Sequence, residues 1–339
     1  MFTPFPEAER GLRFIRVNDE NPGTNPPYRL PFGLQSVDRL GLRRDSRDDS
    51  LSKRADPNGA GALSGPIIGI DIGGSKMRIC VLSQLDGACL QFGTNTCIDT
   101  SGEDLADAIN GVINRLPQPP GAIGIAVPGL VRDGKVVFSD VLPRISGWSP
   151  AESIAAACPM TVLNDAEAAL VEAAAGLPAG ATAVMIMVGT GIGVALLIEG
   201  RIYRGAQGWA GELGSIPTSP AGPLVTLDNI AAGGALLKEL GTRADCISAR
   251  LDAGHAADRM AIERAGAALG FGMATLISII NPERIILGGG TLRLPGYFDS
   301  AVKAARIYTL PQLWDACVIE RAQDSETLVA RGAARRALW

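Results

Sequence analysis

Two segments of this chain share one design: an apolar run, a turn of small residues, and a second apolar run. The first segment covers residues 67–82 and the second covers residues 183–198; their turns contain the glycines at positions 73, 74, 189, 191 and 193. Two β-rich runs around a glycine turn predict a β-hairpin. Glycine leaves the backbone amides of such a turn uncovered, as the binding of a phosphate requires. Since each hairpin opens a segment of domain size, we expect two related α/β lobes that face one nucleotide.

Neither segment matches the common nucleotide-binding motifs. The glycines at 189–193 lack the GxGxxG spacing and precede a strand rather than a helix, and a Walker A motif is absent from the sequence.

Asp71 lies inside the first apolar run, where a carboxylate is costly unless turn amides or the water shell of a metal ion balance its charge. For this segment alone, an ordinary hairpin with an exposed Asp71 explains the pattern equally well.

A second acidic position follows the strand predicted at residues 161–165. Asn164 and Asp165 end this apolar run, and an alanine-rich helix follows over residues 166–173. The carboxyl ends of strands are where α/β sheets bind ligands. Asp165 could accept a proton from a bound hydroxyl, or it could only cap the helix. Taken alone, the cap is the simpler interpretation.

Composition limits the function classes. The chain has 42 glycines among 339 residues, with 47% hydrophobic and 19% charged residues, as in a compact α/β protein of about two domains. A net charge of −4 offers no basic field for nucleic acid or a membrane surface. The longest apolar run, residues 183–198, is too short to span a membrane. Six cysteines without CxxC spacing indicate reduced thiols in the cytoplasm.

Further elements follow from local patterns. Ser101 and Asp104 form a capping box before a helix. A buried strand over residues 122–127 precedes a Pro-Gly turn, and a hairpin is expected over residues 130–138. Residues 265–280 predict a core helix. Residues 1–65 show no sustained periodicity, and we expect either a flexible extension or a wrongly assigned start of the gene.

Six motifs, in their order along the chain, resemble those of ROK-family sugar kinases. They are DIGGSK at residues 71–76, VPG at 127–129, NDA at 164–166, GTGIG at 189–193, GELG at 211–214 and NPERIILGGG at 281–290. The resemblance runs from about residue 66 to the C-terminus. It implies an α/β, two-lobed actin/hexokinase-like (ribonuclease H-like) fold with a central cleft. The small lobe would comprise residues 66–178, completed by a C-terminal helix over 325–339, and the large lobe residues 179–324.

The resemblance also implies an activity, the phosphorylation of a hexose or N-acetylhexosamine by ATP, and a role for each matched residue. Asp165 would be the general base. Asp71 would hold Mg²⁺ through water. The remaining ATP-binding positions would be Gly73, Gly74, Ser75, Lys76, Thr190, Gly191, Gly288, Gly289 and Gly290, and the sugar would contact Gly129, Asn164, Glu212 and Asp228. One carboxylate base, one Mg²⁺ and many amides suffice for phosphoryl transfer. The partners would be a small sugar and ATP, without nucleic acid or membrane, and the resemblance allows a homodimer.

The chain departs from the family pattern at the sugar site. Many members follow the Glu-x-Gly motif with a His that contacts sugar and ligates zinc, and then with a Cys-rich loop. This chain has Ser215, and residues 219–223 contain no Cys, so we expect no zinc site. Asp228 stands where the family has a sugar-binding Glu. Trp209 could wall the sugar site, although a packed aromatic is the preferred interpretation. These departures leave open a sugar-sensing regulator or a non-catalytic binding protein.

Overall fold

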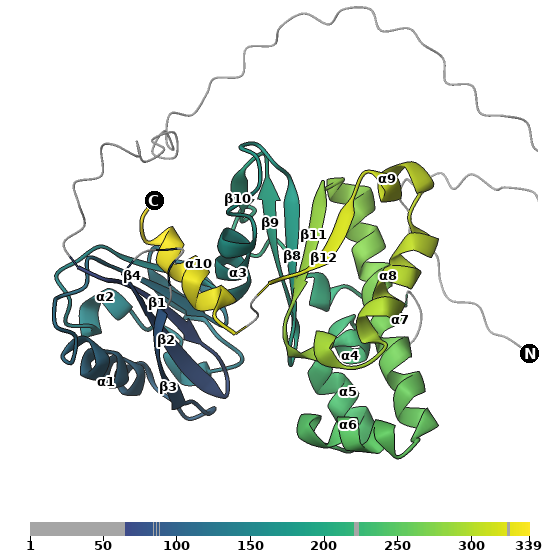
Figure 1. Ribbon diagram of the computed structural model, residues 1–339, viewed down its shortest axis with the longest axis horizontal. Coiled ribbons are helices and arrows are strands. Elements are labelled where there is room, and N and C mark those ends of the chain that lie inside the picture. The colour runs from purple at the N-terminus through teal and green to yellow at the C-terminus, as the bar shows by residue number, and fades with distance from the viewer. Residues whose placement is uncertain (1–64, 84, 86, 88, 220–223, 324–325) are drawn as a thin grey trace, which may run out of the picture. The chain divides into compact units, whose positions relative to one another are not determined.

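The computed structural model describes residues 65–339 except 84, 86, 88, 220–223 and 324–325. Residues 1–64, where the flexible extension is expected, lie outside the described residues. Within the described part, two five-stranded sheets dominate (Figure 1). The first sheet has the order β3-β2-β1-β4-β7, and the second has the order β10-β9-β8-β11-β12.

The two sheets share one pairing pattern. In each, a central strand pairs antiparallel with the next strand of its hairpin and parallel with a later strand. The first sheet contains β1 (Ile67–Ile72), β2 (Lys76–Leu82), β3 (Cys89–Asn95), β4 (Ala122–Val127) and β7 (Met160–Asn164). The second contains β8 (Ala183–Val188), β9 (Ile192–Ile198), β10 (Arg201–Tyr203), β11 (Arg284–Gly288) and β12 (Val318–Arg321). Both predicted glycine hairpins are thereby confirmed. The first sheet lies within residues 66–178 and the second within 179–324, but the lobe boundaries themselves stay predictions.

Helices connect and cover the sheets. In the first half these are α1 (Gly102–Ile113), α2 (Pro150–Ser153) and α3 (Asp165–Ala173), with the short hairpin β5 (Leu130–Arg132) and β6 (Lys135–Phe138) and the 3₁₀ helix η2 (Pro143–Ile145). The second half adds η3 (Leu213–Ser215), α4 (Asp228–Ala231), α5 (Gly233–Leu240), α6 (Ala244–Asp252), α7 (Ala256–Ile280), η4 (Gly290–Arg293), α8 (Tyr297–Tyr308), α9 (Pro311–Asp315) and α10 (Leu328–Arg336). The capping box of α1 and the hairpin β5–β6 agree with the sequence prediction.

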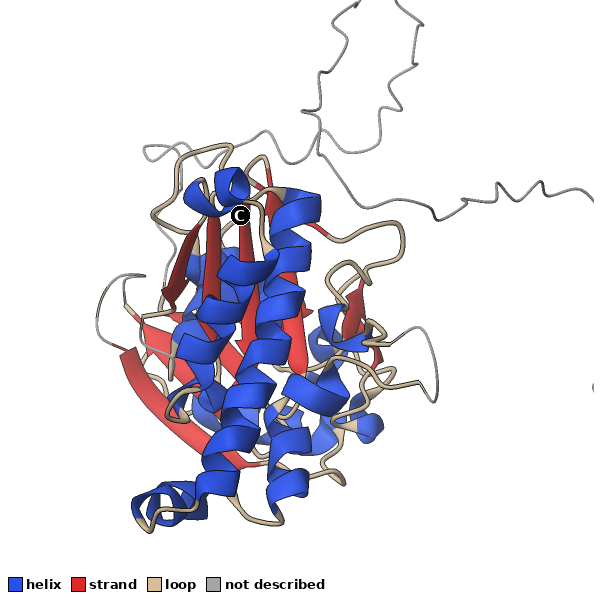
Figure 2. Cartoon of the chain, turned by 90° about the vertical axis from the view of Figure 1, so that its right-hand side faces the viewer, coloured by secondary structure: helices blue, strands red, loops and turns tan. Residues whose placement is uncertain are grey.

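Helix α7 is the main core helix beside the second sheet. It packs along α8, and its buried residues Ile262, Leu269 and Met273 share one apolar cluster with residues of β8, β9 and β11. Figure 2 shows helices in front of these strands. Among the described residues, α7 is the one helix long and apolar enough to cross a membrane, yet 61% of its apolar window is buried inside the protein. This burial is that of a core helix, as predicted for residues 265–280.

Helix α10 returns from the end of the chain to the first sheet. It contacts β1, β4 and α3 (Figure 1). This contact is so close that a Cβ added at Gly124 in β4 would lie 1.8 Å from the carbonyl oxygen of Ala333 in α10. Glycine is therefore required where the helix crosses this strand.

Replacing Gly124 with Ala should destabilise the protein. The added methyl group has to push α10 away from β4, and overpacking of this kind lowers the free energy of unfolding by about 1–3 kcal/mol. Gly111→Ala in α1 is the matched control, because a Cβ there meets nothing within 4 Å and should stabilise the helix by up to about 1 kcal/mol. Urea unfolding measures both changes. Equal stability of the two variants would contradict the close packing of α10.

Candidate functional site

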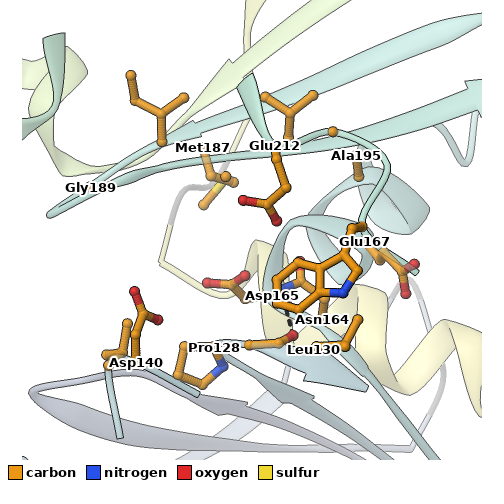
Figure 3. A pocket seen from close by; sticks show the side chains of 18 of the residues that line it. Pro128, Leu130, Asp140, Asn164, Asp165, Glu167, Met187, Gly189, Ala195 and Glu212 are labelled. Atoms are coloured by element: carbon orange, nitrogen blue, oxygen red, sulfur yellow. Dashed lines mark hydrogen bonds between the residues drawn. The ribbon is translucent and has the colours of Figure 1, made fainter. Parts of the chain in front are cut away.

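A cavity of about 390 Å³ lies where several strands of both sheets end (Figure 3). Carboxyl ends of β1, β4, β7 and β8 all lead into it, as expected for ligand sites in α/β sheets. Many residues assigned to a site from the sequence line this cavity: Gly73, Gly74, Gly129, Asn164, Asp165, Thr190, Gly191, Glu212, Asp228 and Gly289. Figure 3 shows the side chains of Asp165 and Asp140 on one side of the cavity and that of Glu212 on the other.

Five other predicted site residues are not among those that line it: Asp71, Ser75, Lys76, Gly288 and Gly290. Ser75 and Lys76 are exposed at the β1–β2 turn. Gly288 ends β11, where a Cβ would meet the side chains of Met185 and Met187. Their roles in binding ATP stay predictions.

The β1–β2 turn is held by hydrogen bonds within the turn and from Thr96. The amide of Gly73 donates to the carbonyl of Lys76 over 2.9 Å, and Thr96 donates from its hydroxyl to the Gly73 carbonyl. Gly74 carries no side chain, and it faces the cavity with Gly73. The turn is thus fixed by its neighbours and presents bare backbone to a ligand.

The β8–β9 turn is held in a way that directs its amides inward. The carbonyls of Gly189 and Thr190 accept hydrogen bonds from the amides of Gly233 and Gly234, over 2.9 and 3.1 Å, at the start of α5. A trans peptide directs its N–H opposite to its C=O. The amides of Thr190 and Gly191 therefore point away from α5, and both residues line the cavity. Such paired amides suit an anionic phosphate.

Asp165 lies at the junction between β7 and α3. One carboxylate oxygen accepts from the amide of Ala166 over 2.8 Å. Burial raises the pKa of Asp165 to about 6, in spite of the hydrogen bonds that favour its charged form. A carboxylate with this pKa is mostly ionised at pH 7 and is basic enough to accept a proton from a bound group.

Asn164, rather than Asp165, is the N-cap of α3. Its Oδ1 accepts from the Ala166 amide over 2.8 Å, and its Nδ2 donates to the Gly129 carbonyl over 3.1 Å. The capping interpretation of the sequence therefore applies to the neighbouring residue, and Asp165 is left to face the cavity. The hydrogen bond to Gly129 also joins the ends of β4 and β7.

Four further carboxylates line the cavity, those of Asp140, Glu167, Glu212 and Asp228. Burial raises the pKa of Glu212 and of Asp228, and the negative charge of Asp140 raises both further. Asp228 accepts from the Ile192 amide over 2.8 Å, so one of its oxygens holds the first residue of β9. Gly214 packs against the same carboxylate, where a Cβ would lie 2.5 Å away. The cavity therefore offers several hydrogen-bond acceptors for hydroxyl groups.

Asp71 fits the outer shell of a divalent cation. Burial, together with the charge of Asp165, raises the pKa of Asp71 to about 6, although Arg78 and Lys76 favour its ionised form. The Arg78 guanidinium lies 3.8 Å from its Oδ2. The described residues contain no cluster of three or more His, Cys, Asp or Glu that could hold a metal ion directly. One carboxylate beside uncovered amides suits an ion brought in by a phosphate ligand.

Several lining residues carry no recognisable signal in the sequence. Asp140 follows β6 without any motif of its own, and Glu167 pairs with Arg204 through two hydrogen bonds of 2.6 and 2.9 Å. These partners stand 37 residues apart, so no local pattern could reveal them. The preferred interpretation of Trp209 as a packed aromatic was wrong, because its side chain is 44% exposed and lines the cavity.

Comparisons with known proteins identify relatives of this chain. The ROK family profile matches residues 67–338. The xylose repressor of Bacillus spizizenii is 30% identical over 279 residues, covering 74% of this chain and 71% of that protein. The N-acetylgalactosamine kinase AgaK of Shewanella sp. is 28% identical over 280 residues, covering 72% and 89%. The chain spans about half (47%) of the length of another relative, the bifunctional enzyme NanE/NanK of Brucella melitensis.

A solved structure shows the same arrangement of elements. The ROK hexokinase from Thermus thermophilus matches with a TM-score of 0.67 and 26% identity, over 80% of this chain and 98% of that one. The α/β fold predicted from the sequence is therefore confirmed. With a family profile that matches most of its length, the chain belongs to the ROK family.

Proposed function

We propose that this chain is an ATP-dependent sugar kinase that phosphorylates a hydroxyl of a hexose or N-acetylhexosamine. The placement of Asp165 supports this proposal most strongly. Its carboxylate faces the same cavity as the inward amides of Thr190 and Gly191 and the bare turn at Gly73 and Gly74. A base and two phosphate-binding turns around one space are the parts that phosphoryl transfer requires.

The chemistry follows from these positions. Asn164, Glu212 and Asp228 hold the sugar hydroxyls so that one of them lies against Asp165. Asp165 takes the hydroxyl proton as the hydroxyl oxygen forms a bond to the γ-phosphorus of ATP. The bond from this phosphorus to the β–γ bridging oxygen breaks, and ADP leaves with that oxygen. The amides of the β8–β9 turn bind the phosphate charge during transfer.

Asp71 would hold Mg²⁺ through water molecules. When bound, Mg²⁺ supplies positive charge that offsets the negative charge of the phosphates. The chain's own part is to keep Asp71 ionised, for which Arg78 and Lys76 are in place.

An acceptor panel tests the activity. ADP release is measured with Mg-ATP and glucose, mannose, fructose, allose, N-acetylglucosamine, N-acetylmannosamine or N-acetylgalactosamine, the last because a kinase of that sugar is among the relatives. We expect turnover above the ATP-only background with at least one of them. If none of these sugars gives turnover, either free or as a glycoside, the kinase proposal fails.

The pH profile should show an acid limb near pH 6. A general base works only when it is deprotonated, and the pKa of Asp165 is raised to about 6. The value of kcat/KM should therefore level off above about pH 7 and fall below pH 6, with a slope that approaches about tenfold per pH unit for one base. Asp71 titrates in the same range, so Asp71→Asn separates the two groups. A flat profile between pH 5 and 8 would contradict the assignment of the base.

A regulatory or sugar-binding protein is the second candidate. It is favoured by the 30% identity to a xylose repressor and by Ser215 and Asp228 at the sugar site. Calorimetric binding of a sugar without any turnover would support it against the kinase. A cytoplasmic location, a homodimer, the absence of zinc and the absence of nucleic-acid partners remain predictions from the sequence.

A further inference from the structure

Three exposed aromatic residues line the cavity, and two of them pair with each other. Phe138 ends β6, Tyr203 ends β10, and Trp209 follows in the loop after β10; their side chains are 50%, 52% and 44% exposed. The rings of Phe138 and Trp209 lie 6.4 Å apart at a tilt of 49°, within the range of a favourable aromatic pair. When a ligand covers large apolar faces inside a cavity, apolar surface is removed from water, and this favours binding.

The backbone fixes the position of Trp209. It stands between Gly208 and Gly211, whose φ angles of +89° and +101° favour glycine. The Ala210 amide closes the loop on the Arg204 carbonyl over 3.1 Å. The backbone that carries the indole is thus held at defined points, which reduces the ordering needed when a ligand binds.

The same loop touches the hairpin β5–β6 opposite. Arg132 donates from Nη2 to the Gln207 carbonyl over 3.1 Å. A Cβ at Gly208 would lie 2.9 Å from Leu130 Cδ1, so the two segments are in direct contact. Phe138, Leu130 and Trp209 thus form one apolar wall, which we call the aromatic wall.

The aromatic wall differs in chemistry from the rest of the cavity. Asn164, Asp165, Glu212 and Asp228 supply acceptors for hydroxyl groups, whereas the side chains of the aromatic wall supply no such acceptor. A free sugar hydroxyl against this wall would lose its hydrogen bonds to water without replacement. A ring attached to the sugar would cover the wall without that loss.

We propose that the aromatic wall binds a ring carried by the acceptor, so that the preferred acceptors are glycosides rather than free monosaccharides. The phosphorylated sugar unit occupies the carboxylate-lined part, and the aglycone or second sugar ring packs on Phe138 and Trp209. This inference rests on the proposed kinase function and names the substrate class of that site.

The test compares glucose and N-acetylglucosamine with their methyl and phenyl β-glycosides. We expect a lower KM for the phenyl glycosides than for the free sugars in the wild-type protein. Trp209→Ala should raise the KM for the phenyl glycosides by about three- to tenfold and change that for the free sugars less than twofold, while Trp209→Phe keeps much of the preference. Phe271→Ala is the matched control, since Phe271 belongs to an exposed aromatic pair with Tyr308 that does not line the cavity; it should change neither KM.

Binding without turnover separates this inference from the proposed function. Calorimetry with phenyl β-glucoside and the wild-type and Trp209→Ala proteins needs no catalysis. Binding that depends on Trp209, without turnover of any acceptor, would support ring binding by the aromatic wall and overturn the proposed kinase activity. Turnover of free sugars with no preference for phenyl glycosides, or an equal effect of Trp209→Ala on both acceptor types, would overturn the wall and leave the kinase in place.

Discussion

Asp165→Asn should reduce kcat by about 10²- to 10⁴-fold, the usual contribution of a general base. The amide has nearly the shape of the carboxylate, and its oxygen can still accept from the Ala166 amide as Asp165 does now. It cannot take the hydroxyl proton. The sugar site should therefore remain formed while transfer slows, and steady-state kinetics should show a loss in kcat with little change in the KM for sugar.

Asp140→Asn is the matched control for this substitution. Asp140 faces the same cavity and is also an acid, but the proposed mechanism gives it no proton to accept. Removing its charge should leave kcat within about tenfold of wild type. The activation free energy of phosphoryl transfer loses only the electrostatic effect of one nearby charge. If Asp165→Asn kept turnover within the same limit, Asp165 would not be the base.

Stability gives an independent check that Asp165→Asn is folded. A carboxyl whose pKa is raised by folding binds its proton more tightly in the native state, so its contribution to stability falls as pH rises from about 4 to about 6. Above pH 6 the buried charge costs the native state on the order of 3 kcal/mol. The Asn variant should therefore be more stable than wild type at pH 8 and no more stable at pH 4. A thermal melt at each pH measures the difference.

The parts of the site that the sequence could predict are those made by neighbouring residues. A glycine turn between two apolar runs determines its own hairpin, and this was enough to place Gly73, Gly74, Thr190 and Gly191 at the ends of strands. Asn164 and Asp165 were placed by the same local logic, at the end of a buried strand. Strand β4 pairs parallel with both β1 and β7, so the ends of these two strands lie at the same edge of the first sheet.

The parts that escaped prediction depend on segments meeting across the chain. Phe138 and Trp209 form a pair only because the loop after β10 contacts the hairpin β5–β6. Strand β3 was missed for another reason. Most of its residues are exposed, so it lacks the alternation of apolar and polar residues that marks a half-buried strand.

Asp228→Ala should weaken both the use of ATP and the binding of sugar. Asp228 accepts from the Ile192 amide at the end of the β8–β9 turn, and it lines the part of the cavity assigned to sugar hydroxyls. Without the carboxylate, this partly buried amide loses its acceptor, which costs about 1–3 kcal/mol. We expect kcat/KM to fall by about 10- to 100-fold for ATP, and the KM for sugar to rise as well.

Asp228→Asn distinguishes the two roles of this side chain. The oxygen of the Asn amide can still accept from the Ile192 amide, whereas its NH₂ group can only donate, so the oxygen should face Ile192. The turn should therefore keep its position, and the KM for ATP should return to within about threefold of wild type. The KM for sugar should stay raised, since the charged acceptor is gone. Asn229→Ala is the control: Asn229 accepts from Thr226 beside α4, so its loss should lower stability without moving the KM for ATP. Equal KM values for ATP in the Ala and Asn variants would mean that Asp228 does not position the turn.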